Sequence, residues 1–115
     1  TYRKLLAQLA DIGLVYVHLV DHAAMGAPVV PLAFKQALRQ AWPRTFFIGG
    51  SFDQASGQHA LTQGITDLVG MGRAFLATPD LVARMRQGLA LNAVDGNTFF
   101  TPGAKGYTDY PVAAL

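Results

Sequence analysis

Three short segments of the chain have the apolar, β-branched and aromatic composition of buried β-strands. They span residues 14–20, 45–48 and 67–69, and the first, Leu14-Val15-Tyr16-Val17-His18-Leu19-Val20, is almost continuously apolar. A continuous apolar run, rather than an alternation of apolar and polar residues, is typical of a parallel strand covered on both faces. The pattern therefore predicts a central, buried strand at 14–20 and two shorter strands after it.

Around these segments, apolar residues recur with the spacing of amphipathic helices. The four predicted helices present the apolar positions Leu5, Leu6, Leu9 and Ile12; Leu32, Phe34, Leu38 and Trp42; Ala55, Ala60 and Leu61; and Leu81, Val82 and Met85. Gly13 ends the first helix and Pro43 ends the second. Asp53 suits the N-cap of the third, which runs to Gly64, and Pro79 suits the N1 position of the fourth, where its missing N–H is no loss.

The order strand, loop, helix occurs three times between residues 14 and 88. Parallel neighbours need such crossover connections, so the sequence predicts an α/β fold with a parallel sheet. These units could form a small doubly wound sheet or part of an eight-unit barrel of typically about 250 residues. The length favours the first architecture, and the motifs described below favour the second. No regular element is predicted after Gly88, so the tail must dock to be ordered.

The amino-acid composition excludes several classes of protein. The chain has 115 residues, 51% hydrophobic and 14% charged, which indicates one ordered domain. No apolar run approaches the ~20 residues of a membrane span. The net charge is only +2, so neither a membrane nor a nucleic acid is an expected partner. The absence of cysteine excludes disulfides, thiolate nucleophiles and zinc ribbons, and it is compatible with the cytoplasm, where we expect this protein.

Glycine-rich turns after the second and third predicted strands give the clearest functional signal. They are Gly49-Gly50-Ser51 and Gly70-Met71-Gly72-Arg73. Glycines at strand ends let backbone N–H groups approach a phosphate, helix N-termini add favourable partial charge, and Arg73 supplies a cation with several donors. In βα barrels the loops after the last two strands frequently form such a phosphate site. The alternative is that the glycines only permit turns and Arg73 pairs with a carboxylate.

The other motifs give weaker evidence for a function, or none. No Gly-x-Gly-x-x-Gly fingerprint, P-loop or Gly-x-Ser-x-Gly elbow occurs, so dinucleotide-fold, P-loop and serine hydrolase functions are unsupported. His18 and His22 fall on a strand and its loop, so their four-residue spacing predicts no metal site. His18 is interpreted as a hydrogen-bonded core residue or a strand-end residue facing a cofactor, and His59 as solvated. The aromatic step Thr98-Phe99-Phe100 indicates a tail that closes a core edge or lines the pocket of a flat ligand.

The string Gly106-Tyr107-Thr108-Asp109-Tyr110-Pro111 closely resembles the C-terminal signature of the Old Yellow Enzyme family of FMN-dependent ene reductases. The resemblance extends backwards through Leu91-Asn92, Thr98-Phe99-Phe100, the segment 72–81, Gly50-Ser51-Phe52 and Tyr16-Val17-His18-Leu19. It therefore covers essentially the whole chain. The order and spacing of these strings are specific, although no single string is.

The resemblance implies that residues 1–115 are the C-terminal segment of a single FMN-binding (β/α)8 TIM-barrel domain, with the three predicted strands as the sixth, seventh and eighth. FMN is then the cofactor at the C-terminal mouth of the barrel. NADPH or NADH serves as the reductant, and a small activated alkene is the substrate whose C=C bond is reduced.

The resemblance also implies roles for individual residues. By position, the cofactor-binding residues are Gly50, Ser51, Phe52, Gly72 and Arg73, and Phe100 is a substrate-binding residue. Gly50 and Ser51 match the residues that hold the FMN phosphate after strand seven, and Gly72 and Arg73 match those after strand eight. Phe52 follows the phosphate loop at the flavin edge. Phe100 stands where many members have a tyrosine that lines the substrate pocket, so its hydroxyl contact is missing.

The family's substrate-orienting histidine or His/Asn pair, tyrosine proton donor and flavin-ring contacts lie in earlier barrel strands that this sequence does not contain. No catalytic residue is therefore predicted here. A three-stranded arc would also leave an unpaired edge and a bare apolar face. We interpret the chain as the phosphate-site segment of an ene reductase, completed by the remaining barrel segment or another copy of the chain. The alternatives are a catalytically incomplete fragment that folds only by association, and a free-standing phosphate-binding α/β module.

Overall fold

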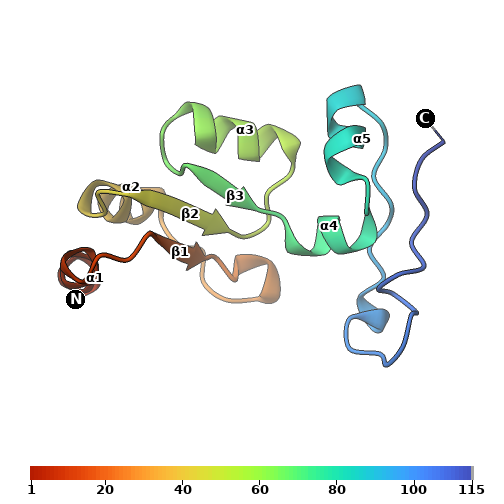
Figure 1. The fold of residues 1–115 in the computed structure, drawn as a ribbon, viewed down its shortest axis with the longest axis horizontal. Helices are drawn as coiled ribbons and strands as arrows, with labels where there is room; N and C mark the ends of the chain where they lie inside the picture. The colour runs from red at the N-terminus through yellow and green to blue at the C-terminus, as the bar shows by residue number, and fades with distance from the viewer. Residues whose placement is uncertain (115) are drawn as a thin grey trace. The chain divides into compact units, whose positions relative to one another are not determined.

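The computed structural model describes residues 1–114, in which helices and strands alternate as predicted (Figure 1). The elements are α1 (Tyr2–Ile12), β1 (Tyr16–Val20), α2 (Leu32–Ala41), β2 (Thr45–Gly49), α3 (Gln54–Thr62), β3 (Leu68–Gly70), α4 (Gly72–Ala77) and α5 (Leu81–Gln87). Short 3₁₀ turns occupy Ala23–Met25 and Gly96–Thr98. The chain divides into two compact units, Thr1–Gly70 and Met71–Leu115. We call these the first and second unit and describe each by itself.

The first unit contains a three-stranded parallel sheet in the order β1-β2-β3. This confirms the predicted α/β class. In the register of the sheet, His18 lies opposite Phe47, which lies opposite Leu68, and Gly49 lies opposite Gly70. The prediction that 14–20 forms the central strand is wrong, because β2 is central and β1 is an outer strand of the sheet.

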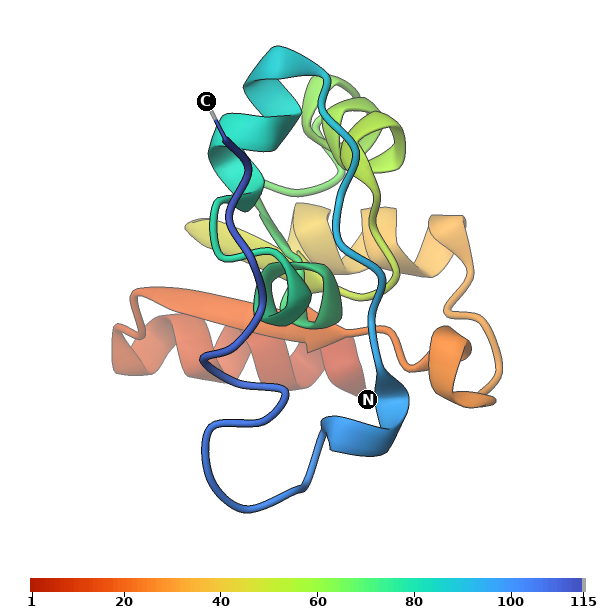
Figure 2. The ribbon, with the colours of Figure 1, turned by 90° about the vertical axis from the view of Figure 1, so that its right-hand side faces the viewer.

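Helices α1 and α2 cover one face of this sheet and close a hydrophobic core (Figures 1 and 2). The buried core residues are Leu6 from α1, Leu38 from α2, Phe46 and Ile48 from β2, and Trp42 and Ile65 from the segments before β2 and β3. The Trp42 indole Nε1 donates a hydrogen bond to the Thr45 carbonyl oxygen at 2.9 Å. This bond satisfies the only polar atom of the indole ring, so the ring can be buried at little cost.

The opposite face of the sheet is open. Tyr16 and Leu68 are 57% and 54% exposed, whereas Val17 and Leu19, which alternate with the outward residues of β1, pack against the core. The predicted burial of residues 14–20 on both faces is therefore wrong for this chain. The apolar pattern of β1 is that of a two-sided strand, but the helices of the first unit cover only one side.

The ends of several helices agree with their predicted caps. Gly13 adopts a left-handed conformation (φ 88°) and ends α1. The Asp53 carboxylate accepts a hydrogen bond from the Ser56 N–H at 2.7 Å, and the Ser56 hydroxyl oxygen accepts one from the Asp53 N–H at 3.0 Å, which forms a capping box on α3. These hydrogen bonds, of which the backbone bond from Ser56 is the strongest, hold the pKa of Asp53 below its ordinary value.

Three details of the predicted helices are wrong. The six-residue helix α4 directly after β3 was not predicted. Helix α5 begins at Leu81 with Asp80 as N-cap, so Pro79 is not at N1 but in a turn closed by a hydrogen bond from Leu81 N–H to the Thr78 carbonyl. Several predicted core positions are exposed instead: Leu5, Ile12, Leu32, Leu61 and Val82. Spacing identifies the apolar stripe of a helix but not which of its edges a neighbour covers.

In the second unit, the tail after α5 is held by hydrogen bonds rather than by regular structure. Two extended stretches, 89–95 and 110–114, run in opposite directions and are joined by a loop (Figure 2). The Asn92 side-chain amide donates to the carbonyl oxygens of Ala77 and Pro111, at 2.8 and 2.7 Å, and the Asn92 N–H donates to the buried Thr78 hydroxyl at 3.1 Å. The predicted docking of the tail is thus confirmed.

Candidate functional site

The glycines at the ends of β2 and β3, and those just after these strands, do not serve to form left-handed turns. Gly49, Gly50, Gly70 and Gly72 all lie outside the positive-φ region, where glycine is favoured. Any residue can adopt their backbone conformation. Left-handed turn geometry therefore does not explain these glycines, and the role of their missing side chains has to be judged from the space around them.

For three of them, the reason is close packing inside the first unit. A Cβ at Gly49 would lie 2.6 Å from His18 Nε2, and one at Gly70 would lie 3.0 Å from the Phe47 ring and 3.2 Å from the Cα atom of Gly49. A Cβ at Gly50 would lie 3.2 Å from the Asp21 Cβ atom. At these positions a methyl group would push neighbouring atoms apart.

Gly72, in the second unit, is different. A Cβ built on Gly72 meets nothing within 4 Å, and the residue is exposed at the start of α4. Packing within the described residues therefore gives no reason for a glycine here. Close approach of a ligand or of another chain segment to the backbone would account for a glycine at this position, which lies next to Arg73.

Arg73 is exposed, and its guanidinium group lies over the Phe99 ring, 5.6 Å from the ring centroid. The ion pairs between side chains of residues 1–114 join Lys35 to Asp21, Arg39 to Asp67 and Arg84 to Asp80, and none includes Arg73. The alternative that Arg73 is neutralised by a carboxylate is therefore wrong for this part of the chain. Its charge and its five N–H donors are available to an anion.

The loop after β2 offers a second set of polar groups. Ser51 is exposed, and its side chain takes part in none of the hydrogen bonds found within residues 1–114. Phe52 is half-buried and packs against the core of the first unit. The N-terminus of α3 is occupied by the Asp53 carboxylate, so the predicted helix contribution to a phosphate site is not available there in this structure.

A charged pair holds the loop after β1 beside Gly50. The Lys35 ammonium group lies 2.7 Å from the Asp21 carboxylate, and the Asp21 N–H donates to the Gly49 carbonyl oxygen at 2.8 Å. The hydrogen bond from Lys35 holds the pKa of the Asp21 carboxyl below its ordinary value, against the opposing effect of desolvation. The pair fixes the backbone next to Gly50 and compensates the negative charge of Asp21.

The histidines do not form a metal centre. His18 is exposed on β1 and stacks on Phe47, with the ring centroids 4.0 Å apart and the planes 9° apart, so its interpretation as a buried core residue is wrong. His22 contacts Met25, and His59 is exposed on α3, as predicted. Within residues 1–114 no three His, Asp or Glu side chains come close enough to hold a metal ion. None of the helices described is long and apolar enough to cross a bilayer.

The two phenylalanines of the tail behave differently. Phe99 contacts Arg73, whereas Phe100 is 96% exposed.

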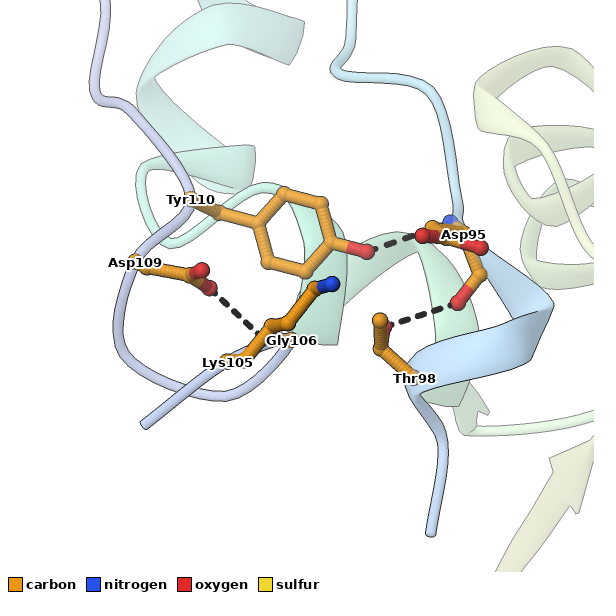
Figure 3. Close-up of a pocket in the computed structure, with 6 residues that line it drawn as sticks. All are labelled: Asp95, Thr98, Lys105, Gly106, Asp109 and Tyr110. Carbon is orange, nitrogen blue, oxygen red and sulfur yellow. Dashed lines mark hydrogen bonds between the residues drawn. The ribbon is translucent and has the colours of Figure 1, made fainter. Parts of the chain in front are cut away.

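The loop that carries these phenylalanines also borders an open cavity of about 230 Å³, which is lined by Asp95, Thr98, Lys105, Gly106, Asp109 and Tyr110 (Figure 3). The Tyr110 hydroxyl accepts a hydrogen bond from the Asp95 N–H at 3.1 Å, and the Gly106 N–H donates to the Asp109 carboxylate at 2.7 Å. These bonds give the loop a defined shape.

The most connected side chain of the second unit was not singled out from the sequence. Arg84 is only 6% exposed and donates to the Asp80 carboxylate at 2.9 Å, to the Asn92 side chain at 3.0 Å, and to the carbonyl oxygens of Ala90 and Pro111, both at 2.9 Å. It ties α5 to both extended stretches of the tail. The four-residue spacing of Asp80, the N-cap residue, and Arg84 in α5 was the available signal, but the distant backbone partner of Arg84 at Pro111 could not be predicted from spacing.

Comparison with known proteins identifies the family to which this chain is similar. Residues 5–92 match the model of the NADH:flavin oxidoreductase / NADH oxidase family. Among curated relatives, 12-oxophytodienoate reductase 2 of Arabidopsis thaliana is 34% identical over 93% of this chain and 29% of its own length. Chanoclavine-I aldehyde reductase of Penicillium roqueforti is 35% identical over 98% of this chain and 32% of its own length.

Solved structures agree with these relatives. Morphinone reductase superimposes with a TM-score of 0.89 at 34% identity, over 97% of this chain and 30% of the reductase. A second structure holds morphinone reductase in complex with tetrahydroNAD and has a TM-score of 0.86. The chain therefore spans about a third of the length of these proteins.

Proposed function

The chain belongs to the NADH:flavin oxidoreductase / NADH oxidase family, the Old Yellow Enzyme family that its sequence resembles. Because the chain belongs to this family, we propose that it supplies the FMN phosphate site of an ene reductase. It does so as the C-terminal part of a (β/α)8 barrel, comprising about the sixth to eighth strands. We call the chain together with the rest of that barrel the completed barrel. The remaining segment is part of the same polypeptide or is provided by another chain.

The pair Gly72 and Arg73 carries this proposal. Gly72 leaves its backbone open to a ligand, and Arg73 presents an unpaired charge beside it. A dianionic phosphate is the ligand that such a pair fits best, because it accepts hydrogen bonds from both a backbone N–H and a guanidinium group. The family resemblance also assigns Gly50 and Ser51 to the FMN phosphate, and within the first unit the exposed side chain of Ser51 supports this assignment.

The other residues of the proposed site face the rest of the flavin and the substrate. Phe52 lies after the phosphate loop and contacts the flavin edge, and its packing against the core fixes its position. Phe100, fully exposed here, lines the substrate pocket of the completed barrel. Its phenyl ring offers apolar contact without a hydrogen bond, which favours an alkene with an apolar substituent at that point.

The reaction we propose is the reduction of an activated alkene by NADH or NADPH. The chemistry that bound FMN would supply is hydride transfer, by which reducing equivalents of the nicotinamide would reach the electron-poor C=C bond. The tetrahydroNAD complex of morphinone reductase and the reductase names of the relatives support this class of reaction. By the family resemblance, the groups that orient the alkene and protonate it belong to the remaining barrel segment.

The open sheet face supports the need for a partner segment. Tyr16, Val20 and Leu68 are exposed on the face that the helices leave bare, and β1 and β3 are outer strands. Exposed apolar faces and unpaired strands favour association. The second candidate function is that of a catalytically incomplete fragment, which associates with its own copy and binds little flavin. The same observations favour this second candidate when no completing segment is supplied.

The proposal is tested by comparing FMN with riboflavin, which lacks the phosphate. In the completed barrel, Arg73→Ala removes one charged set of hydrogen bonds to the phosphate, worth about 1.5–3 kcal/mol. We therefore expect FMN to bind about 10- to 150-fold more weakly. Riboflavin affinity stays unchanged, because the lost contact involves only the phosphate. Flavin fluorescence quenching measures both dissociation constants.

Arg86→Ala is the matched control, since Arg86 is an exposed arginine on α5 of the same unit. It removes the same net charge without touching the proposed site. Equal FMN affinity of the Arg73→Ala and wild-type proteins, or equal losses for FMN and riboflavin, would remove Arg73 from the phosphate site and contradict the proposal.

A further inference from the structure

The contact between Arg73 and Phe99 joins two parts of the second unit that are distant in the chain. Arg73 lies in the first turn of α4, and Phe99 follows the 3₁₀ turn Gly96–Thr98 in the tail. The guanidinium carbon lies 5.6 Å from the ring centroid, within the range of a cation–π interaction. Phe100, the next residue, is 96% exposed, so the loop presents one specific ring to the arginine.

The position of Phe99 is determined by its loop. Thr98, immediately before it, is buried, and its hydroxyl donates to the Asp95 carbonyl oxygen at 2.9 Å. The Tyr107 hydroxyl donates to the carbonyl oxygen of Phe99 itself. Gly106 has a φ of +81°, and a Cβ there would collide with the Thr98 side chain and lie 2.9 Å from its carbonyl oxygen. The backbone on both sides of Phe99 is therefore restrained.

An aromatic ring holds an arginine in a way that a carboxylate does not. A carboxylate would neutralise the guanidinium charge and occupy several of its N–H donors, whereas a ring contact uses no donor. A long arginine side chain loses conformational freedom when it binds a ligand, and holding it beforehand reduces that cost. Phe99 can thus orient Arg73 and leave its charge and hydrogen bonds for an anion.

We propose that Phe99 is a positioning residue for Arg73, which orients the guanidinium group for the FMN phosphate. This inference rests on the proposed function of Arg73. It assigns to the tail a part in cofactor binding through a residue that touches Arg73 rather than through direct contact with the phosphate.

The test measures the ratio of the riboflavin to the FMN dissociation constant in the completed barrel. Phe99→Leu keeps an apolar side chain and removes the ring, so we expect this ratio to fall about two- to fivefold, the value of an exposed cation–π contact. Phe99→Tyr and Phe99→Trp retain an aromatic face and should keep the ratio of the wild type. Phe100→Leu is the matched control, because it removes the adjacent, exposed ring and should leave the ratio unchanged.

A double variant separates positioning from general damage to the loop. If Phe99 acts through Arg73, Phe99→Leu has no further effect on the ratio in an Arg73→Ala background. If Phe99→Leu lowers the affinities for FMN and riboflavin equally, or if Phe99→Trp lowers the ratio as much as Phe99→Leu, Phe99 is only a structural residue and the inference is overturned.

These outcomes are distinguishable from a failure of the proposed function. An Arg73→Ala variant with an unchanged ratio contradicts the phosphate site itself and the inference with it. An Arg73→Ala variant with a lowered ratio, combined with an unaffected Phe99→Leu variant, keeps the phosphate site and overturns the positioning role.

Discussion

At the scale of single residues, four glycines that look alike in the sequence have two different physical roles. Gly49, Gly50 and Gly70 are closely packed by atoms of their own unit, whereas Gly72 faces open space. The sequence could predict that glycines follow both strands, because turns and phosphate loops share this composition. It could not separate the two roles, since the distances from His18 and Phe47 exist only in the folded sheet.

This difference predicts opposite effects of the same substitution. In the completed barrel, Gly70→Ala forces a methyl group against Phe47, so we expect a loss of about 1–3 kcal/mol in the free energy of unfolding, as for other overpacked positions. Gly72→Ala meets nothing in the described structure and should leave that free energy unchanged. Instead it should weaken FMN binding by about 1.5–3 kcal/mol, because the methyl group displaces the phosphate from the backbone N–H.

Urea unfolding and FMN titration of the two variants check this pair of expectations. The two glycines serve as controls for each other, since each substitution adds one methyl group near the end of β3. A Gly72→Ala protein that binds FMN as the wild type does would show that the open space at Gly72 is not used by the cofactor.

At the scale of elements, α5 and the tail depend on a network around Asp80 and Arg84. Asp80 is the N-cap residue of α5, and its carboxylate accepts hydrogen bonds from Arg84 Nε at 2.9 Å and from the Ala113 N–H at 2.8 Å rather than from the first turn of the helix. The sequence predicted a helix near this point and a docked tail, because helical spacing and the lack of regular pattern after Gly88 are local features. The partners of Arg84 could not be predicted, since they depend on how the tail returns to α5.

The network predicts a dependence of stability on pH. The pKa of the Asp80 carboxyl lies below its ordinary value, mainly because of the hydrogen bond from the Ala113 N–H and also because of Arg84. A depressed folded-state pKa contributes stability that is present above the unfolded value of 3.8 and is lost as the pH falls through the lower folded value. The free energy of unfolding should therefore decrease in acid below about pH 4.

Asp80→Asn removes this ionisation, so the variant should be less stable than the wild type at neutral pH, and the difference should shrink in acid. Unfolding by urea at a series of pH values measures it. Asp11→Asn, which changes an exposed carboxylate on α1, is the control. A constant difference between the Asp80→Asn and wild-type proteins across this range would contradict the assigned role of the carboxylate.

At the scale of the whole molecule, the apolar pattern of β1 predicts more burial than the described residues provide. Its continuous apolar run predicts burial on both faces, yet Tyr16 is 57% exposed. The discrepancy agrees with the chain spanning about a third of the length of its relatives. The sequence could predict the α/β class from local composition, and the bare face from the resemblance of the chain to part of a larger barrel. It could not supply the second layer, which lies outside these residues.

The central claim, that this chain supplies the FMN phosphate site of a completed barrel, is tested most directly by measuring the flavin retained after gel filtration. The chain alone and the completed barrel are each incubated with FMN, separated by size and read by visible absorbance. We expect the chain alone to elute as a self-associated species without flavin, and the completed barrel to retain about one FMN per chain, as one phosphate site per barrel requires. A completed barrel that retains no flavin, or a monomeric isolated chain that retains it fully, would contradict the account.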